Sequence, residues 1–410
     1  MTTFTARLVP SISTVEAKAW DACANPPGRA PGDAEGERFN PFISHAFLRA
    51  LEESGSVGGR SGWTPAHVTV EDGRGRLVAA APAYLKSHSQ GEYVFDHAWA
   101  DAYERAGGRY YPKLQVAIPF TPVTGRRLLV AADAPEGARE TLIGALRAVR
   151  NETKASSIHA TFPTAEDADR LANAGFLIRN GEQFHFSCEG FSHFDDFLGA
   201  LASRKRKAIK RERREALDGG VGIEWLTGAS IRPEHWDAFF KFYMHTGSRK
   251  WGRPYLTRAF FELIGAALAD RILLVMARRA GRYIAGAINF IGDDALYGRN
   301  WGAIEHRPFL HFEVCYYQAI DFALARGLRR IEAGAQGEHK LARGYRPALT
   351  YSAHEFADAR LARAIADYLS HERQAVERTI AHYEEHAPFR RGEDDARRDE
   401  RMGESFDADV

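Results

Sequence analysis

The chain has 410 residues and a formal net charge of only +1, with 45% hydrophobic and 27% charged residues. This composition is typical of a globular protein with a sizeable core, and the length favours two domains. A nearly neutral chain has no global field that attracts nucleic acid or membranes, so any such affinity must be local. The three cysteines lie far apart without a CxxC pair, which indicates neither a disulfide framework nor a zinc site.

No segment of the sequence predicts export or membrane insertion. The first residues lack a basic region followed by an apolar run, and the longest apolar zone, 263–277, is interrupted by Asp270 and Arg271. We therefore expect no signal peptide and no membrane span, and we expect a cytoplasmic location.

The first half of the chain predicts helices and strands in alternation. A helix at 41–53 precedes a hairpin whose strands are 65–70 and 77–85. Segment 91–124 follows and is rich in titratable and aromatic residues. The closing elements are a strand at 128–131, a helix at 139–154, a strand at 157–161, a helix at 165–174 and a strand pair within 176–187. We place the turn of that strand pair at Asn180-Gly181, because Asn-Gly is a strong hairpin signal.

The second half predicts a similar series after a long helix at 191–218. The series consists of a strand at 223–226, helices at 233–246 and 257–269, a hairpin at 272–290, a strand at 295–301, a helix at 313–326 and strands at 330–333 and 351–356. Residues 361–385 predict one further helix, and the charged tail after His386 predicts disorder. We expect domains at 1–190 and 191–360, with 361–410 as a C-terminal helix and tail.

Several stretches resemble a known superfamily. The order of elements in each half is that of GNAT acetyltransferases, and two such units in tandem resemble the FemAB/Fem-ligase superfamily. The stretch "SRKRKAIKRERREAL" is similar to the basic helix that joins the two units, and "GRYIAGAINF" is similar to the central hairpin. The stretches "PFISHAFLRALEESGSV" and "AGAQGEHKLARGYRP" resemble the FemAB-like family of predicted N-acyltransferases, described as peptidoglycan biosynthesis/recognition proteins.

This resemblance implies an α/β fold of two GNAT-like domains with mixed, mostly antiparallel sheets flanked by helices. It implies an acyltransferase that moves an acyl or aminoacyl group to an amine. The donor would be acyl-CoA or aminoacyl-tRNA, with no tightly bound cofactor, and the acceptor a small-molecule amine or a cell-wall precursor. After Trp301 the chain lacks the glycine loop with which single-domain GNAT enzymes grip coenzyme A, so acetyl-CoA is not secured as the donor.

The stretch 328–347 is the first candidate site, because a short apolar strand ends there in glycines and a cluster of charges. By resemblance, Lys340 lies at the substrate cleft, and we expect Arg343 and Arg346 to hold an anionic group with it. Glu338 and His339 are candidate proton carriers. We expect Lys340 to be exposed, so that Lys340→Ala changes stability by less than about 1 kcal/mol. The alternative is a solvated charge cluster.

Two further groups extend the candidate site. His311 and Glu313 lie where the helix at 313–326 begins, so Glu313 is a candidate base for the attacking amine and His311 a binding residue. In the first half, the candidates to orient an amine acceptor are Asp96, as a catalytic residue, and Asp101, Tyr111 and Lys113, as binding residues. The alternatives are a helix end stabilised by charge and a solvated surface helix.

The basic helix is a candidate surface for a polyanionic donor. It holds eight basic residues between Arg204 and Arg214. We expect the binding residues to be Lys207, Lys210, Arg211 and Arg214. The alternative is a solvated interdomain helix. No histidine pattern indicates a metal site. A non-catalytic protein of the same fold that recognises a cell-wall precursor or RNA is the alternative to the transferase.

Overall fold

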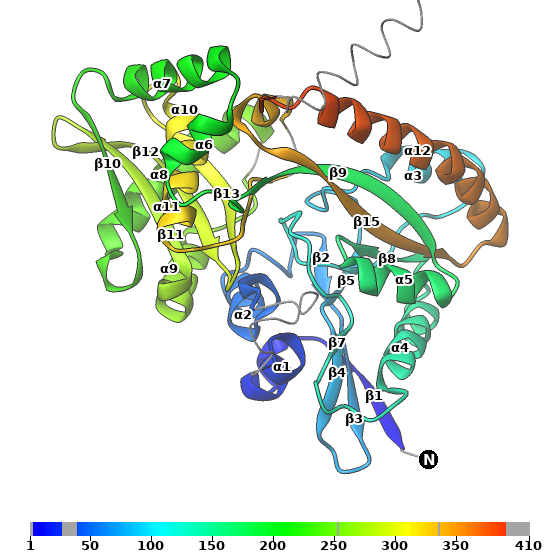
Figure 1. Ribbon diagram of the computed structural model, residues 1–410. Helices are drawn as coiled ribbons and strands as arrows, with labels where there is room; N and C mark the ends of the chain where they lie inside the picture. Colours follow the sequence, from blue (N-terminus) through cyan, green and yellow to red (C-terminus); the bar gives the residue numbers. More distant parts are fainter. Residues whose placement is uncertain (1–2, 27–38, 252–253, 335–336, 391–410) are drawn as a thin grey trace, which may run out of the picture.

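The computed structural model describes residues 3–26, 39–251, 254–334 and 337–390, which form two lobes that share one large sheet (Figure 1). Among the described residues this sheet has eleven strands, and their spatial order mixes the two halves of the chain. From edge to edge the strands are β10 (Val221–Leu226), β11 (Ile272–Arg279), β12 (Arg282–Ile291), β13 (Ala295–Ala303), β14 (Arg330–Glu332), β9 (Leu177–Ser187), β15 (Arg346–Phe356), β8 (Ser157–Thr161), β6 (Lys113–Val116), β5 (Ala83–Lys86) and β2 (Trp63–Pro65).

A smaller sheet and the helices cover the rest of the described chain. The small sheet has the order β1 (Phe4–Val9), β3 (His67–Asp72), β4 (Leu77–Ala81) and β7 (Leu129–Val130). The helices are α1 (Ala17–Ala24), α2 (His45–Glu53), α3 (His97–Arg105), α4 (Ala138–Glu152), α5 (Ala165–Asn173), α6 (Phe194–Ala200), α7 (Ser203–Leu217), α8 (Pro233–Trp251), α9 (Arg258–Leu268), α10 (Leu310–Phe312), α11 (Gln318–Ala325) and α12 (Ala359–Glu385). Among the described residues no helix is both long and apolar enough to cross a membrane.

The two halves exchange their closing strands. Strand β9 of the first half lies between β14 and β15, and strand β15 of the second half lies between β8 and β9. Figure 1 shows both long strands crossing from one lobe to the other beneath α12. Each half also contains one parallel strand pair, β6–β8 and β13–β14, at the same point in its series of elements. This repeat confirms the predicted α/β fold of two GNAT-like units, while the domain boundaries stay a prediction.

The exchange explains why the predicted hairpin at Asn180-Gly181 is wrong. Both residues lie inside the continuous strand β9, where Gly181 faces Thr350 of β15. A Cβ at Gly181 would lie only 3.1 Å from the Thr350 Oγ1 atom, so the glycine allows the two strands to approach. The ladder with β15 therefore overrides the local turn signal.

The predicted helix at 191–218 is also divided. It consists of α6 and α7, which are separated by the buried Leu201. Leu201 forms a bridge with Phe389, and the N–H of Ala202 donates to the carbonyl of Pro388 at 3.0 Å. The C-terminal segment thus occupies the break between the helices. The predicted helix at 361–385 is confirmed as α12, whereas residues 391–410 of the predicted tail lie outside the described part.

Opposite faces of the large sheet contribute to two hydrophobic clusters. One contains Phe290 and Tyr297 together with side chains of α2, α8 and α9. It joins the lobes, since Phe47 of the first half contacts Phe260 of the second with ring centroids 5.6 Å apart. The other contains Leu296 and Ile331 with side chains of α6 and α11. This alternation fixes which side of the sheet each polar residue of β13 and β14 faces.

Candidate functional site

The second half of the chain opens where the parallel strands β13 and β14 separate. Their pairing ends at Tyr297 and Glu332, but β13 continues to Ala303. The backbone of β13 beyond Tyr297 therefore has no partner strand on that side in the described structure. Buried backbone donors without partners are expensive to maintain, so such a gap is a natural place for a ligand to bind.

A β-bulge on β13 directs a side chain toward this gap. Ile288 of β12 pairs with Asn300, whereas the next residue of β12, Asn289, pairs with Gly298. Arg299 is the extra residue, and bulges commonly redirect side chains beside active sites. The Arg299 guanidinium has no hydrogen bond or ion pair among the described residues. Burial lowers the pKa of Arg299 below its ordinary value, against the opposing charges of Tyr93 and Glu332.

A narrow cavity of about 80 Å³ occupies the gap. Its lining comes from both faces of the sheet, because Trp301 belongs to one face and Asn300 to the other. The indole N–H of Trp301 is buried without a hydrogen-bond partner in the described chain. The remaining lining residues are Ala287, Ile288, Asn289, Gly298, Arg299, His311, Cys315, Tyr316 and Ala333. The cavity is thus lined by neighbouring residues of β13 that belong to opposite faces of the sheet, and two of its lining side chains, Arg299 and Trp301, carry donors without a hydrogen-bond partner in the described structure.

Lys340 lies beside this cavity but is not exposed, so the predicted exposure is wrong. Its side chain is only 1% exposed, and its Nζ donates to the carbonyl of Gly334 at 2.7 Å. Burial lowers the pKa of Lys340 to about 7, and the positive charge of Arg299 acts in the same direction. Near neutral pH this lysine therefore exists in both protonation states. Shifted pKa values of this kind are common at functional sites.

Two other predicted residues are committed to structural ion pairs. Glu313 is fully buried, and its carboxylate accepts hydrogen bonds from Arg213 and from Gln318. Arg343 is buried as well; it pairs with Glu212 at 2.8 Å and lies over the Phe312 ring. A base needs a free lone pair, so the contacts of Glu313 argue against its predicted role as a base. Arg343 keeps one buried donor, Nε, without a hydrogen-bond partner in the described structure, so its anion-binding role stays a prediction.

The predicted histidines do come together at the cavity. His311 lines it, with its ring 4.6 Å from that of Trp301 and 6.1 Å from that of His339. His339 is exposed, and its Nε2 lies 2.9 Å from the Tyr316 hydroxyl, which also lines the cavity. Arg346 is exposed and lies over Phe389. The side chain of Glu338 lies outside the described part of the structure.

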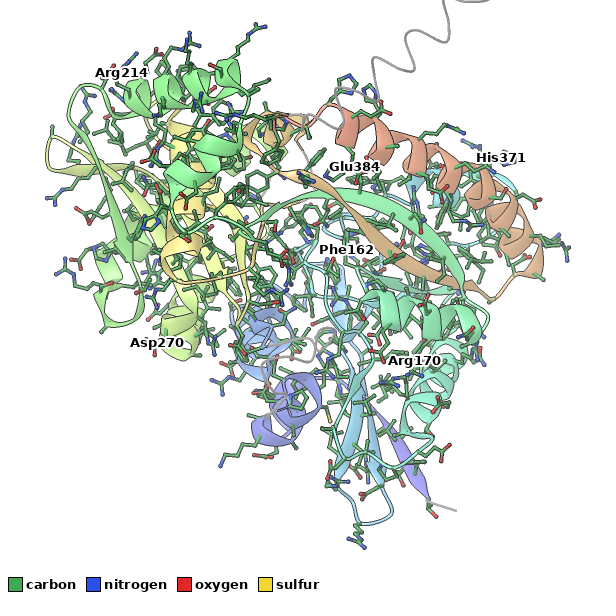
Figure 2. All side chains as sticks on the ribbon, in the orientation of Figure 1. Phe162, Arg170, Arg214, Asp270, His371 and Glu384 are labelled. Carbon is green, nitrogen blue, oxygen red and sulfur yellow. The ribbon has the colours of Figure 1, made fainter. Side chains whose placement is uncertain are left out.

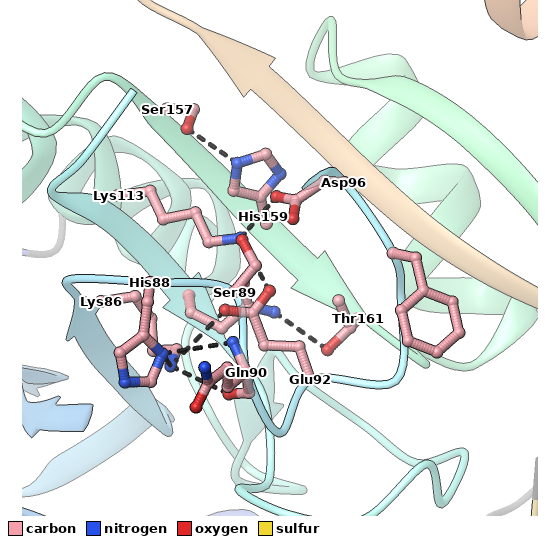
Figure 3. Close-up of polar contacts among 12 residues, drawn as sticks. Lys86, His88, Ser89, Gln90, Glu92, Asp96, Lys113, Ser157, His159 and Thr161 are labelled. Carbon is pink, nitrogen blue, oxygen red and sulfur yellow. Dashed lines mark hydrogen bonds and ion pairs between the residues drawn. The ribbon is translucent and has the colours of Figure 1, made fainter. Parts of the chain in front are cut away.

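The predicted acceptor residues of the first half form a separate, internal ion cluster (Figure 3). Lys113 is fully buried and donates to Glu92, to Ser89 and to Asp96. Burial raises the pKa of Glu92 to about 7 and lowers that of Lys86 to about 7. For Asp96, burial acts to raise the pKa, but Lys113 outweighs it and the net shift is downward. Lys113 and Asp96 are thus bound to each other inside the first half, while Asp96 Oδ1 and Glu92 Oε1 are buried without a hydrogen-bond partner in the described structure. The catalytic role of Asp96 and the binding role of Lys113 stay predictions.

Asp101 and Tyr111 lie near the surface around this cluster. Asp101 is exposed on the helix α3. The Tyr111 hydroxyl lies 2.9 Å from the Ser89 Oγ atom. No described contact links either side chain to the cavity, so their binding roles stay predictions.

The basic helix α7 lies beside the helical segment that lines the cavity. Its residues Glu212 and Arg213 bond to Tyr317 and Glu313 of the π-helical turn η5 (Glu313–Tyr317). The four predicted donor-binding residues, Lys207, Lys210, Arg211 and Arg214, are all exposed. An open hollow of about 600 Å³ is lined by Lys207, Arg211 and their basic neighbours Arg204 and Lys205. Figure 2 shows Arg214 on this outer helix, where side chains with nitrogen atoms point away from the lobe.

Of the residues that line the cavity, only His311 was a predicted site residue; Arg299, Trp301 and Tyr316 were not. The signal available for Arg299 was the run Gly298-Arg299-Asn300 inside an otherwise apolar strand, since polar residues interrupting a buried strand indicate a bulge.

One group of metal-type ligands exists among the described residues. It consists of the exposed side chains of His382, Glu385 and His386, whose ligand atoms lie within 4.8 Å of one another.

Comparison with known families gives the class of the protein. Residues 11–391 match the FemAB-like family, described as "Peptidoglycan biosynthesis/recognition". This match covers nearly the whole chain, so the protein belongs to the FemAB-like family, as the resemblance of its motifs indicated. The match supports the predicted transferase class. No curated protein matches the chain significantly.

The chain is also similar to solved structures. FemX is 13% identical in sequence, with a TM-score of 0.52, and the similarity covers 86% of this chain and 98% of FemX. L-PGS from Bacillus licheniformis is 10% identical with a TM-score of 0.48, covering 82% of this chain and 98% of that protein. A tandem GNAT protein from the clavulanic acid biosynthesis pathway is 12% identical with a TM-score of 0.43, covering 87% and 99%. At this identity the likeness to FemX supports the fold alone.

Proposed function

We propose that this protein transfers an acyl or aminoacyl group from a thioester or ester donor to an amine, and that the reaction takes place in the cavity between β13 and β14. The observation that carries the proposal is the set of unsatisfied donors in that gap. The Arg299 guanidinium has no described partner, the Trp301 indole N–H is buried without one, and the β13 backbone lacks a partner strand. Donors prepositioned in this way stabilise the oxyanion that forms when an amine attacks a carbonyl.

The cavity orients the donor rather than reacting with it. An amide forms when the amine nitrogen attacks the carbonyl carbon and the C–S or C–O bond to the leaving group breaks. The narrow volume of about 80 Å³ suits the carbonyl and its adjoining atoms. Lys340, held beneath the gap by Gly334, adds positive charge when it is protonated. This use of Lys340 agrees with its position at the cleft in the resemblance.

The polyanionic part of the donor lies outside the cavity in this proposal. The exposed basic face of α7 is supported by the hollow of about 600 Å³ and by the contacts of α7 with η5. Phosphates of coenzyme A or of tRNA would bind there through charge, with an affinity that falls steeply as salt rises. The acceptor class, a small amine or a cell-wall precursor, and the cytoplasmic location remain predictions.

The test is a product assay with both donor types. The protein is incubated with acyl-CoA or with aminoacyl-tRNA and a panel of primary amines, and amide products are detected by mass spectrometry. Amide formation by the wild type and its loss in Arg299→Met support the proposal. Saturable binding of tRNA or of a cell-wall precursor without any turnover would instead support the non-catalytic binding protein.

A further inference from the structure

Glu332 and His185 lie side by side at the point where the two halves exchange strands. Glu332 is the last residue of β14, and His185 is its direct antiparallel partner on β9. The neighbours Ile331 and Phe186 belong to the cluster on one face of the sheet, so Glu332 and His185 point to the opposite face. One residue comes from each half of the chain, and the pair exists only because the closing strands are exchanged.

The Glu332 carboxylate is only partly satisfied. Its Oε1 accepts a hydrogen bond from Arg330 Nε at 3.1 Å, whereas its Oε2 is buried without a hydrogen-bond partner in the described structure. The side chain is only 3% exposed. His185 Nε2 lies 4.0 Å from this Oε2 atom and 3.4 Å from Gln183 Oε1. A buried carboxylate oxygen without a donor is unfavourable, so this atom indicates a missing hydrogen-bond donor.

The pair lies next to the proposed reaction site. Ala333, which follows Glu332 directly, lines the cavity. The charges of Glu332 and Arg299 interact, and so do those of Lys340 and His185. Neither Glu332 nor His185 lines the cavity itself, so an amine bound at Glu332 would lie beyond Ala333, on the sheet face opposite Tyr316. Tyr93 of the first half interacts electrostatically with Arg299, which lines the cavity.

We propose that Glu332 binds the amino group of the acceptor through Oε2 and takes its proton, with His185 as a positioning residue. The proposal rests on the proposed function and assigns a site for primary amines to the face between the lobes. The acceptor site then uses one residue from each half of the chain, Glu332 from the second and His185 from the first.

The reaction balances with these groups. The acceptor arrives as an ammonium ion and gives one proton to Glu332. The neutral nitrogen attacks the donor carbonyl, the C–S or C–O bond breaks, and the leaving group departs with the second proton as a thiol or a hydroxyl. Glu332 then returns its proton to solvent. No metal, oxidant or further reactant is needed for this balance.

The local charges favour deprotonation of a bound amine. Arg299 and Arg330 both lie near Glu332, and a positive environment disfavours a second cation. Charged neighbours also act on the pKa of His185. Burial lowers the pKa of His185, the negative charge of Glu332 acts to raise it, and the positive charges of Arg330 and Lys340 act to lower it. An amine held there loses its proton more readily than one in water.

The test compares two nucleophiles on the intact protein. Methylamine is almost fully protonated at neutral pH and needs a base, whereas hydroxylamine is largely neutral and does not. With acyl-CoA or aminoacyl-tRNA as donor, we expect Glu332→Gln to lower kcat/KM for methylamine about 100-fold at pH 7. We expect the same variant to keep the rate with hydroxylamine within about 3-fold. Glu332→Asp should recover part of the methylamine activity, and Glu189→Gln, at an exposed pair with Arg329, is the matched control.

The outcomes separate the two proposals. If the wild type transfers to neither nucleophile from either donor, the proposed function is overturned. Suppose that the wild type is active. If Glu332→Gln then loses transfer activity equally with both nucleophiles, or keeps it with both, only the role of Glu332 is overturned. The titration of His185, followed by NMR, adds a measurement that needs no activity. We expect its pKa to fall in Glu332→Gln, and an unchanged pKa would show that the two side chains are not coupled.

Discussion

The two halves of the chain repeat one arrangement and use it differently. Each half has a pair of parallel strands in the described structure, β6 with β8 and β13 with β14. In the first half β6 ends at Val116 together with its pairing, and the chain itself fills the space beyond: the N–H of Gly125 donates to the carbonyl of Phe162 at 3.0 Å. Arg127, only 1% exposed, donates to the carbonyls of Thr161, Gly125 and Val123.

In the second half the corresponding gap stays open and contains Arg299, which no described residue binds. An arginine saturated by carbonyls holds the fold together, whereas an arginine without partners is available to a ligand. The parallel strand pair that both halves share therefore does not by itself make a site. The site exists because no described side chain fills the gap between β13 and β14.

The largest expected effect tests whether Arg127 stabilises the first half of the chain. Arg127→Met removes the donors to three buried carbonyls, and we expect the free energy of unfolding to fall by about 3–5 kcal/mol. Urea denaturation followed by circular dichroism measures this change. A loss of less than about 1 kcal/mol would show that Arg127 does not hold the first gap closed.

The matched substitution in the second half should affect function instead. We expect Arg299→Met to lower transfer about 100-fold, because the oxyanion loses a prepositioned donor. Its free energy of unfolding should change by less than about 1 kcal/mol, since Arg299 makes no hydrogen bond with a described residue. Steady-state kinetics and the same urea titration check both values. Full activity in this variant would remove the distinction between the two arginines.

The buried lysines extend the comparison to pH. The pKa values of Lys86 in the first half and Lys340 in the second are each lowered by burial to about 7. Between about pH 7 and pH 10 the unfolded chain therefore holds protons that the folded chain has released, so each lysine makes stability rise with pH in this range. Replacing either by Met should flatten that rise by on the order of 1–2 kcal/mol, measured by denaturation at several pH values.

The two lysine variants should differ in transfer activity. We expect Lys340→Met to lose transfer and Lys86→Met to keep it, because only Lys340 lies beside the cavity. A Lys86→Met protein that folds normally but has lost transfer would connect the internal cluster of Figure 3 to catalysis.

The smallest expected effect concerns the donor surface. Lys210→Ala should reduce the slope of log affinity against log salt for tRNA or coenzyme A by about 1, with stability changed by less than about 0.5 kcal/mol. Arg378→Gln, exposed on α12, is the control and should leave the slope unchanged. Equal slopes for wild type and Lys210→Ala would place the donor elsewhere.

Local patterns in the sequence predicted much of the fold. The order of elements in each half, the helix α12 and the exposure of Lys207, Lys210, Arg211 and Arg214 follow from spacing and charge, which neighbouring residues decide. The cluster around 328–347 was placed near the site for the same reason, as a glycine turn after a buried strand is a local feature. The motifs also identified the family.

Tertiary structure decided the rest. Whether Asn180-Gly181 turns or continues depends on a strand distant in sequence, and only the ladder with β15 provides it. Likewise, Glu313 and Arg343 looked available because their partners, Arg213 and Glu212, lie on another helix. The burial of Lys340, the exposure of Arg299 to an open gap and the pairing of Glu332 with His185 all depend on contacts between distant segments. The sequence by itself determined the family and the repeated units, whereas the packing between those units decided which gap remained open.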